Sequence, residues 1–224
     1  MPATRTVLAD QAYESVRALI MDHVFGPGVR ISIDTLAREL GISQTPMREA
    51  LARLEADGLV TKQALRGYSV APLLSERQLG ELFEFRFRLE PWSAARAAER
   101  VTAEGRAQLK RELKSLRVLP LGTNYEKYKS VIAHDQRLHQ LLFEIAGNTV
   151  VTQAYERAHC HLHLYRLSYR RDLSTQTVEE HRRITSAVID GQPDEAFEAM
   201  EDHLNRSRGR YAEVFATGEK VATP

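Results

Sequence analysis

The sequence predicts a mainly α-helical protein, with an N-terminal winged helix-turn-helix followed by an antiparallel bundle of six or seven helices. Three observations support this fold class. Residues 36–54 hold two runs of apolar residues at helical spacing, separated by a glycine. Residues 59–70 are typical of a short hairpin. Beyond Pro72 no stretch alternates with a period of two, so we expect strands only in the first part of the chain.

The first part begins with an amphipathic helix predicted over residues 13–24 and a Gly/Pro-containing turn at 25–28. Apolar residues from Leu36 to Leu40 then recur at helical spacing, which indicates a second helix. Gly41 ends it, because glycine tolerates the backbone conformation that commonly terminates helices.

The third helix is expected to begin close to Ser43 or Thr45, either of which can cap it, with Pro46 in its first turn, where no backbone N–H is needed. Gly58 ends this helix. Its buried stripe is predicted to comprise Met47, Ala50, Leu51 and Leu54.

A hairpin of residues 59–61 and 65–70 follows, with Arg66 and Gly67 near its tip. In a helix-turn-helix the first turn of the last helix faces base edges and phosphates, and a glycine beside a cation can approach the DNA backbone closely. Residues 1–72 contain eight Lys/Arg and eight Asp/Glu, so counting shows no basic patch. The predicted DNA contacts are Arg38, Ser43, Gln44, Thr45, Arg48, Arg66 and Gly67.

The remainder of the chain is predicted to be helical, and its short connections make sequential helices antiparallel neighbours. We expect helices at 75–99, 102–118, 124–147, 149–170, 175–190 and 193–215. The domains are therefore 1–72, a DNA-binding winged helix-turn-helix; 73–217, a helical domain for which the family resemblance given below implies effector binding and dimerisation; and 218–224, a flexible tail.

One constellation in the bundle predicts a metal site. Asp135 and His139 lie four residues apart and share a helix face. His181 and His203 are about equally far from the turn at 191–194, so an antiparallel pair brings them to the same height. Three imidazoles and a carboxylate suit a divalent transition metal: zinc foremost, with nickel, manganese or cobalt as alternatives.

Several other polar residues leave alternatives open. Arg86 can pair with an effector carboxylate, or form an ordinary salt bridge. Asn148 follows a helix-ending glycine and can cap the next helix or approach the effector. On one continuous helix His159 and His163 share a face and His161 points elsewhere, so the three cannot join one site; we expect surface or pocket-lining positions.

Composition narrows the function classes. The net charge of +1 argues against a general polyanion binder. The sequence has no run of eighteen apolar residues and no signal-peptide core, which predicts a soluble, cytoplasmic protein without membrane contact. A single cysteine excludes an internal disulfide. The Asp/His cluster leaves two alternatives to a ligand-responsive regulator: a metal-dependent hydrolase or lyase, and a direct metal sensor. We expect no enzyme, because no H-E-x-x-H motif or phosphate loop is present.

The N-terminal part resembles the GntR family of bacterial transcription regulators. The residues that carry the resemblance are, in order, Tyr13, Val16, Pro27-Gly28, Ile31, Leu36-Ala37, Leu40-Gly41-Ile42-Ser43, Thr45-Pro46, Arg48-Glu49-Ala50-Leu51, Leu54 and Gly58-Leu59-Val60. The resemblance implies that the positions of Ser43, Gln44, Thr45, Arg48, Arg66 and Gly67 touch operator DNA. Position 44 departs from the pattern, because arginine is common there. Glutamine favours adenine where arginine favours guanine.

Residues 79–206 resemble the FCD ligand domain of the FadR-type branch of that family. The matching motifs are Phe85-x-x-x-Leu89-Glu90, Asp135-x-x-Leu138-His139, Ala146-Gly147-Asn148, Glu180-His181-x-x-Ile184 and Met200-x-x-His203-Leu204. The resemblance implies that Asp135, His139, His181 and His203 bind a metal that helps to hold a carboxylate effector. It also implies a homodimer on a palindromic operator and, as the default, a repressor released by its effector.

Overall fold

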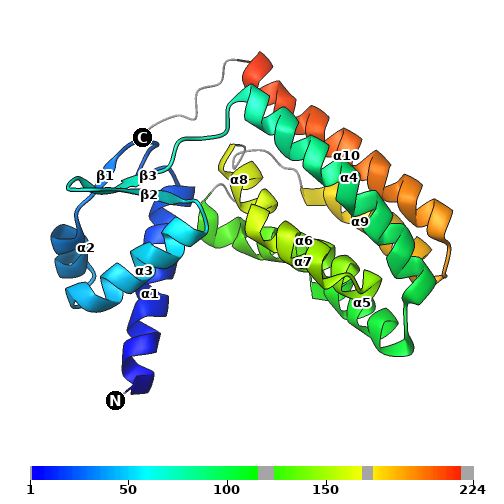
Figure 1. Cartoon of the computed structure of the whole chain (residues 1–224), viewed down its shortest axis with the longest axis horizontal. Coiled ribbons are helices and arrows are strands. Elements are labelled where there is room, and N and C mark those ends of the chain that lie inside the picture. Colours follow the sequence, from blue (N-terminus) through cyan, green and yellow to red (C-terminus); the bar gives the residue numbers. More distant parts are fainter. Residues whose placement is uncertain (1, 116–123, 168–173, 218–224) are drawn as a thin grey trace. The chain divides into compact units, whose positions relative to one another are not determined.

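The structure is a computed structural model that describes residues 2–115, 124–167 and 174–217 (Figure 1). The chain divides into two compact units, with the boundary between Leu73 and Leu74. The predicted flexible tail, 218–224, lies outside the described residues. None of the described helices is both long enough and apolar enough to cross a membrane.

Three helices build the N-terminal unit: α1 (Pro2–Met21), α2 (Ile33–Glu39) and α3 (Gln44–Ala56). Ser32 caps α2 by accepting a hydrogen bond from the backbone N–H of Thr35. Gly41 has a φ of +65°, which allows the tight turn into α3. The apolar stripe predicted for α3 is buried.

The first helix begins eleven residues earlier than predicted. Residues 3–12 contain no glycine or proline and continue the helix, and Ala9 and Ala12 are buried in the unit's core. The prediction was wrong because it followed only the larger apolar residues, whereas small alanines also mark the buried face.

The wing is a three-stranded antiparallel sheet rather than the predicted hairpin. Strands β2 (Val60–Gln63) and β3 (Gly67–Val70) form the hairpin, and β1 (Arg30–Ile31) adds to the outer edge of β3, in the order β1-β3-β2. The extra strand has only two residues, too few to show a period of two.

The second unit is all helical in its described parts. Its elements are α4 (Glu76–Arg100), α5 (Ala103–Ser115), α6 (Tyr125–Ala146), α7 (Thr149–Ala158), α8 (Cys160–Leu167), α9 (Ser174–Ile189) and α10 (Pro193–Ala216). Helix α4 packs along α10 and α6, and α10 also packs on α9, so α4, α6, α9 and α10 enclose the core (Figure 1).

The single helix predicted over 149–170 is two helices. His159 adopts a left-handed conformation with φ +43°, and its N–H donates to the carbonyl of Glu156, which ends α7. Helix α8 then begins at Cys160. No glycine or proline marks this break, so apolar spacing could not reveal it.

Candidate metal centre and DNA-reading surface

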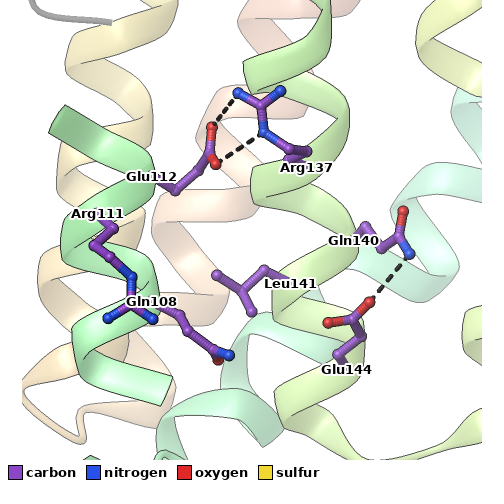
Figure 2. Close-up of a pocket in the computed structure, with 7 residues that line it drawn as sticks. All are labelled: Gln108, Arg111, Glu112, Arg137, Gln140, Leu141 and Glu144. Atoms are coloured by element: carbon purple, nitrogen blue, oxygen red, sulfur yellow. Dashed lines mark hydrogen bonds and ion pairs between the residues drawn. The ribbon is translucent and has the colours of Figure 1, made fainter. Parts of the chain in front are cut away.

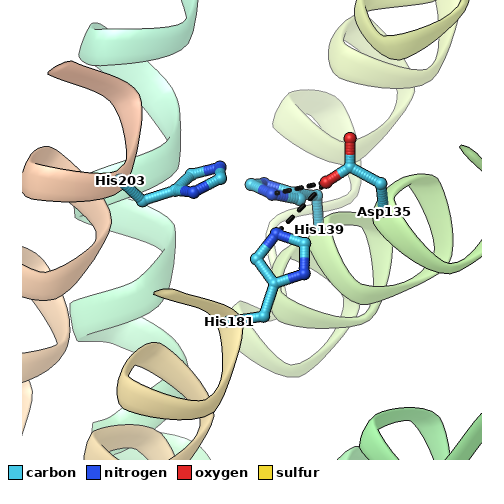
Figure 3. Close-up of side chains that lie close together, drawn as sticks. All are labelled: Asp135, His139, His181 and His203. Carbon is cyan, nitrogen blue, oxygen red and sulfur yellow. Dashed lines mark ion pairs between the residues drawn. The ribbon is translucent and has the colours of Figure 1, made fainter. Parts of the chain in front are cut away.

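The structure brings the four predicted metal ligands together in the second unit. Asp135 and His139 come from α6, His181 from α9 and His203 from α10, and Figure 3 shows the four side chains pointing at one another. One ligand atom from each lies within 4.8 Å of all the others, and all four residues are buried. A buried cluster of this composition could hold a metal ion.

The atoms that face the centre of this cluster lack ordinary partners. Oδ1 of Asp135 lies 3.1 Å from Nε2 of His181 and 3.6 Å from Nε2 of His139. These three buried atoms make no hydrogen bond to any described residue. Buried polar atoms are rarely left unsatisfied, and a cation between them would satisfy all three at once. The donor set therefore fits a divalent transition metal.

Helix α4 provides a carboxylate that contacts His139 through the ring nitrogen that does not face the centre of the cluster. Oε2 of Glu90 lies 2.6 Å from Nδ1 of His139, which leaves Nε2 for the centre. Arg86 holds the same carboxylate through contacts of 2.5 and 3.1 Å, and neither side chain of this pair is exposed by more than 1%. Burial alone would raise the pKa of Glu90, but Arg86 and His139 outweigh it and hold that pKa well below its ordinary range.

A second carboxylate supports His203 in the same way. Nδ1 of His203 donates to Oε2 of Glu180 at 2.8 Å, and Arg210 grips both oxygens of Glu180 at 2.8 and 2.9 Å. Although burial opposes the charge, His203 and Arg210 lower the pKa of Glu180 to about 2. Carboxylate partners of this kind orient metal-binding imidazoles and increase their basicity.

Two further histidines complete the surroundings of the cluster. His134 lies 3.1 Å from Nδ1 of His181, and His161 lies 2.7 Å from Oδ2 of Asp135. The other ring nitrogen of His161 is 2.8 Å from the hydroxyl of Tyr155. The expectation that His161 occupies a surface or pocket-lining position was incomplete, because the break at His159 resets the helical phase and brings it to the cluster. The family motifs also gave no signal for His134.

The ligands carry the charges that a metal site requires. Burial lowers the pKa of His139 to about 3 and that of His203 to about 4, so both imidazoles are neutral at pH 7. Burial alone would raise the pKa of Asp135, but His161 and His181 bring it well below its ordinary range, so this carboxyl is ionised. Neutral imidazole and carboxylate are the forms that bind metal.

A small cavity of about 10 Å³ adjoins the cluster. Its lining includes Arg86, Asp135, His203, Tyr165 and Arg210. Arg86 therefore reaches the cluster as well as pairing with Glu90. The other residue predicted to bind an effector does not: Asn148 is exposed and caps α7 through the N–H of Val151.

The remaining histidines of the 159–163 segment lie apart from the ligand set. His159 forms the break between α7 and α8, and both His159 and His163 are half-buried. Neither belongs to the group of side chains that could hold the ion.

The residues predicted to touch DNA are all exposed in the N-terminal unit. Ser43 occupies the N-cap position of α3, and Gln44 and Thr45 begin the helix, with Arg48 one turn on. Arg38 is exposed on α2. Arg66 and Gly67 lie where the β2–β3 turn meets β3, and Gly67 has a φ of +79°.

Gln44 links two neighbours on this surface. Its amide nitrogen donates to Asp34 at 2.5 Å, and its amide oxygen accepts from Arg48 at 3.3 Å. Exposed hydrogen bonds of this kind contribute little stability and exchange readily with other partners.

The comparisons with known proteins agree with this architecture. Residues 8–70 match the bacterial regulatory proteins of the gntR family, and residues 81–206 match the FCD domain. The uncharacterized HTH-type transcriptional regulator YdhC of Bacillus subtilis is 27% identical over 94% of this chain and 93% of its own length. The HTH-type transcriptional repressor GlaR of Escherichia coli is 27% identical over 89% and 93%.

Among solved structures, E. coli McbR/YncC has the same fold, with a TM-score of 0.69 at 20% identity over 95% of this chain and 99% of that one. The family matches and the relatives' names identify a transcription regulator rather than an enzyme. This chain is a member of the GntR family of bacterial transcription regulators, built from a helix-turn-helix domain and an FCD domain.

Proposed function

We propose that this protein is a FadR-type repressor whose grip on a palindromic operator is released by a small organic acid bound beside a divalent metal. The observation that carries the proposal is the buried Asp/His cluster, whose inward-facing atoms lack hydrogen bonds to described residues and which adjoins a cavity lined by Arg86. A bound cation would supply positive charge to hold a carboxylate there.

The DNA half of the proposal rests on the exposed face of α2, α3 and the wing. A homodimer would place two α3 helices in successive major grooves, about 34 Å apart, on a palindromic site. Arg48 and Arg66 would contact phosphates or base edges, and Gln44 would favour adenine. Phosphate contacts would make the affinity fall steeply with salt.

The size of the cavity supports the regulatory half. About 10 Å³ holds roughly one water molecule, whereas an organic acid has several non-hydrogen atoms. An acid that enters this cavity therefore needs the bundle to open around it. A ligand that discriminates between two shapes of the same domain supplies the differential affinity that allosteric coupling requires.

The test measures operator affinity by fluorescence anisotropy, using a duplex selected from a random pool. Metal-loaded protein is titrated with a panel of small carboxylic acids and, as matched controls, their amides. We expect one class of acid to weaken DNA binding by about 5–150-fold, the usual range of allosteric coupling. The amides and the metal-free protein should show no such response.

Two results would contradict the proposal. If the selected duplexes shared no sequence preference, the protein would have no specific operator. A change of affinity caused by metal alone, with no further effect of any acid, would replace the acid sensor by a direct metal sensor.

A further inference from the structure

We propose that Glu112 and His134 are positioning residues for the metal, which together hold His181 as a ligand through its Nε2 atom. This inference rests on the metal site of the proposed function, but it concerns two residues outside the predicted ligand set. His134 lies on α6 and Glu112 on α5, a helix that contributes no ligand to the cluster.

The three side chains form a continuous line from the cluster outward. Nδ1 of His181 lies 3.1 Å from Nε2 of His134, and Nδ1 of His134 lies 2.9 Å from Oε1 of Glu112. The imidazole of His134 is buried, with 1% of the residue exposed, so water does not compete for these contacts. The two rings are 5.2 Å apart.

The chemistry of the three side chains fixes the direction of the hydrogen bonds between them. An ionised carboxylate can only accept hydrogen bonds, so the proton of neutral His134 must lie on Nδ1. Nε2 of His134 is then an acceptor, and Nδ1 of His181 must carry the proton that it receives. Nε2 of His181 is left with a free lone pair, and this atom faces Oδ1 of Asp135 at 3.1 Å.

Glu112 is itself held in place from the surface side. Arg137 donates to both of its oxygens at 2.9 and 3.0 Å, and Ser115 adds a hydroxyl contact at 3.1 Å. Figure 2 shows the two hydrogen bonds between Arg137 and Glu112 at one end of a cleft between α5 and α6. The volume of this cleft is about 410 Å³. The side chain of Glu112 is 14% exposed, so the line connects the buried cluster to the protein surface.

His181 differs in this respect from the other two imidazoles of the cluster. Glu90 contacts His139 directly and Glu180 contacts His203 directly, whereas a second imidazole stands between His181 and its carboxylate. Rotation of either His134 or Glu112 therefore disorders this ligand, and the packing of α5 on α6 affects metal binding.

The test compares metal affinities of full-length variants by competition with a chromophoric zinc chelator. His134→Leu should lower zinc affinity by about 10–100-fold, the usual effect of losing an outer partner of a metal ligand. Glu112→Gln keeps an acceptor but removes the charge, so we expect a smaller loss, of about tenfold. The matched control is Glu144→Gln in the same cleft, whose carboxylate bonds Gln140 and has no described contact with the cluster; its affinity should equal that of wild type.

A second readout separates positioning from general destabilisation. Nitrogen-15 spectra of histidine-labelled, zinc-loaded protein should show the ring protons of His134 and His181 on Nδ1, and Glu112→Gln should redistribute the proton of His134. Thermal unfolding of the metal-free variants controls for folding. If His134→Leu does not fold, the zinc affinity of Glu112→Gln provides the test, because position 112 reaches the surface.

The outcomes distinguish this inference from the proposed function. If wild-type protein binds no divalent metal, the metal in the proposed function and the positioning role of Glu112 and His134 are both contradicted. Wild-type protein that binds zinc, with both variants binding equally tightly, overturns only the role of Glu112 and His134. A proton on Nε2 of His181 in the loaded protein overturns it as well.

Discussion

The predicted DNA-reading surface and the candidate metal centre are built in opposite ways. Residues such as Arg48 and Gln44 are exposed and meet each other through a single 3.3 Å contact. The candidate metal ligands are buried, and each has an outer partner within about 3 Å: Glu90, Glu180, His134 or His161. The first region stays adaptable until DNA arrives, whereas the second is organised in advance, as a binding site for a small ion needs to be.

Removing one candidate ligand from the organised region has the largest expected effect on metal binding. Asp135→Asn replaces the only carboxylate of the ligand set and also weakens the contact with His161. Because loss of an outer partner already costs about 10–100-fold, we expect zinc affinity to fall by more than about 100-fold in a chelator competition assay.

The matched control for that change is Asp202→Asn, an exposed aspartate of α10 that pairs with Arg183. It should bind zinc as wild type does, and both variants should keep their metal-free affinity for operator DNA. Zinc binding by Asp135→Asn at the wild-type level would show that this cluster is not the metal site.

Acidification of the metal-free protein tests whether the buried histidines of the same region are neutral. The pKa values of His139 and His203 lie near 3 and 4, below the value of about 6.5 in the unfolded chain, so between pH 6.5 and 4 only the unfolded state takes up these protons. The free energy of unfolding should fall by about 1.4 kcal/mol per pH unit for each histidine across this window.

Glu180 continues the trend at lower pH. Its pKa of about 2 lies below that of an unfolded glutamate, so its contribution is present above about pH 4.5 and is lost as the pH falls towards 2. Urea titrations at intervals from pH 7.5 to 4.5 check the histidine window. A flat profile there would mean that these imidazoles are not held neutral.

Truncating one contact of the adaptable region has the smallest expected effect. Arg48→Ala should weaken operator binding by about 1–3 kcal/mol, because it removes a predicted charged contact to DNA from an exposed position of α3. Anisotropy titrations at several salt concentrations measure it. The control Arg77→Ala removes an exposed arginine from α4, in the other unit. Equal affinities for the two variants would move DNA recognition away from the start of α3.

The sequence predicted the parts of the molecule that depend on local periodicity. The α2–α3 turn is predicted by apolar residues at helical spacing that Gly41 interrupts. The candidate ligand set is predicted by one pair of residues four apart on a helix and by a second pair at about equal distances from the turn between two helices. The outer partners could not be found in this way. Glu90, His134 and Glu112 reach the cluster through packing between helices, which leaves no spacing rule in the chain. The prediction for His161 was incomplete, because a single residue, His159, breaks the helical phase on which its direction depended.

The cavity beside the cluster has a consequence for timing. If the acid effector proposed above binds in this cavity, which holds about one water in its closed shape, it cannot bind on first collision and waits for the bundle to open. The observed association rate then levels off, at high acid concentration, at the rate of opening. A cell that carries this regulator would respond to its acid at a pace governed by the packing of α4, α6, α9 and α10, and not by how quickly the acid diffuses to it.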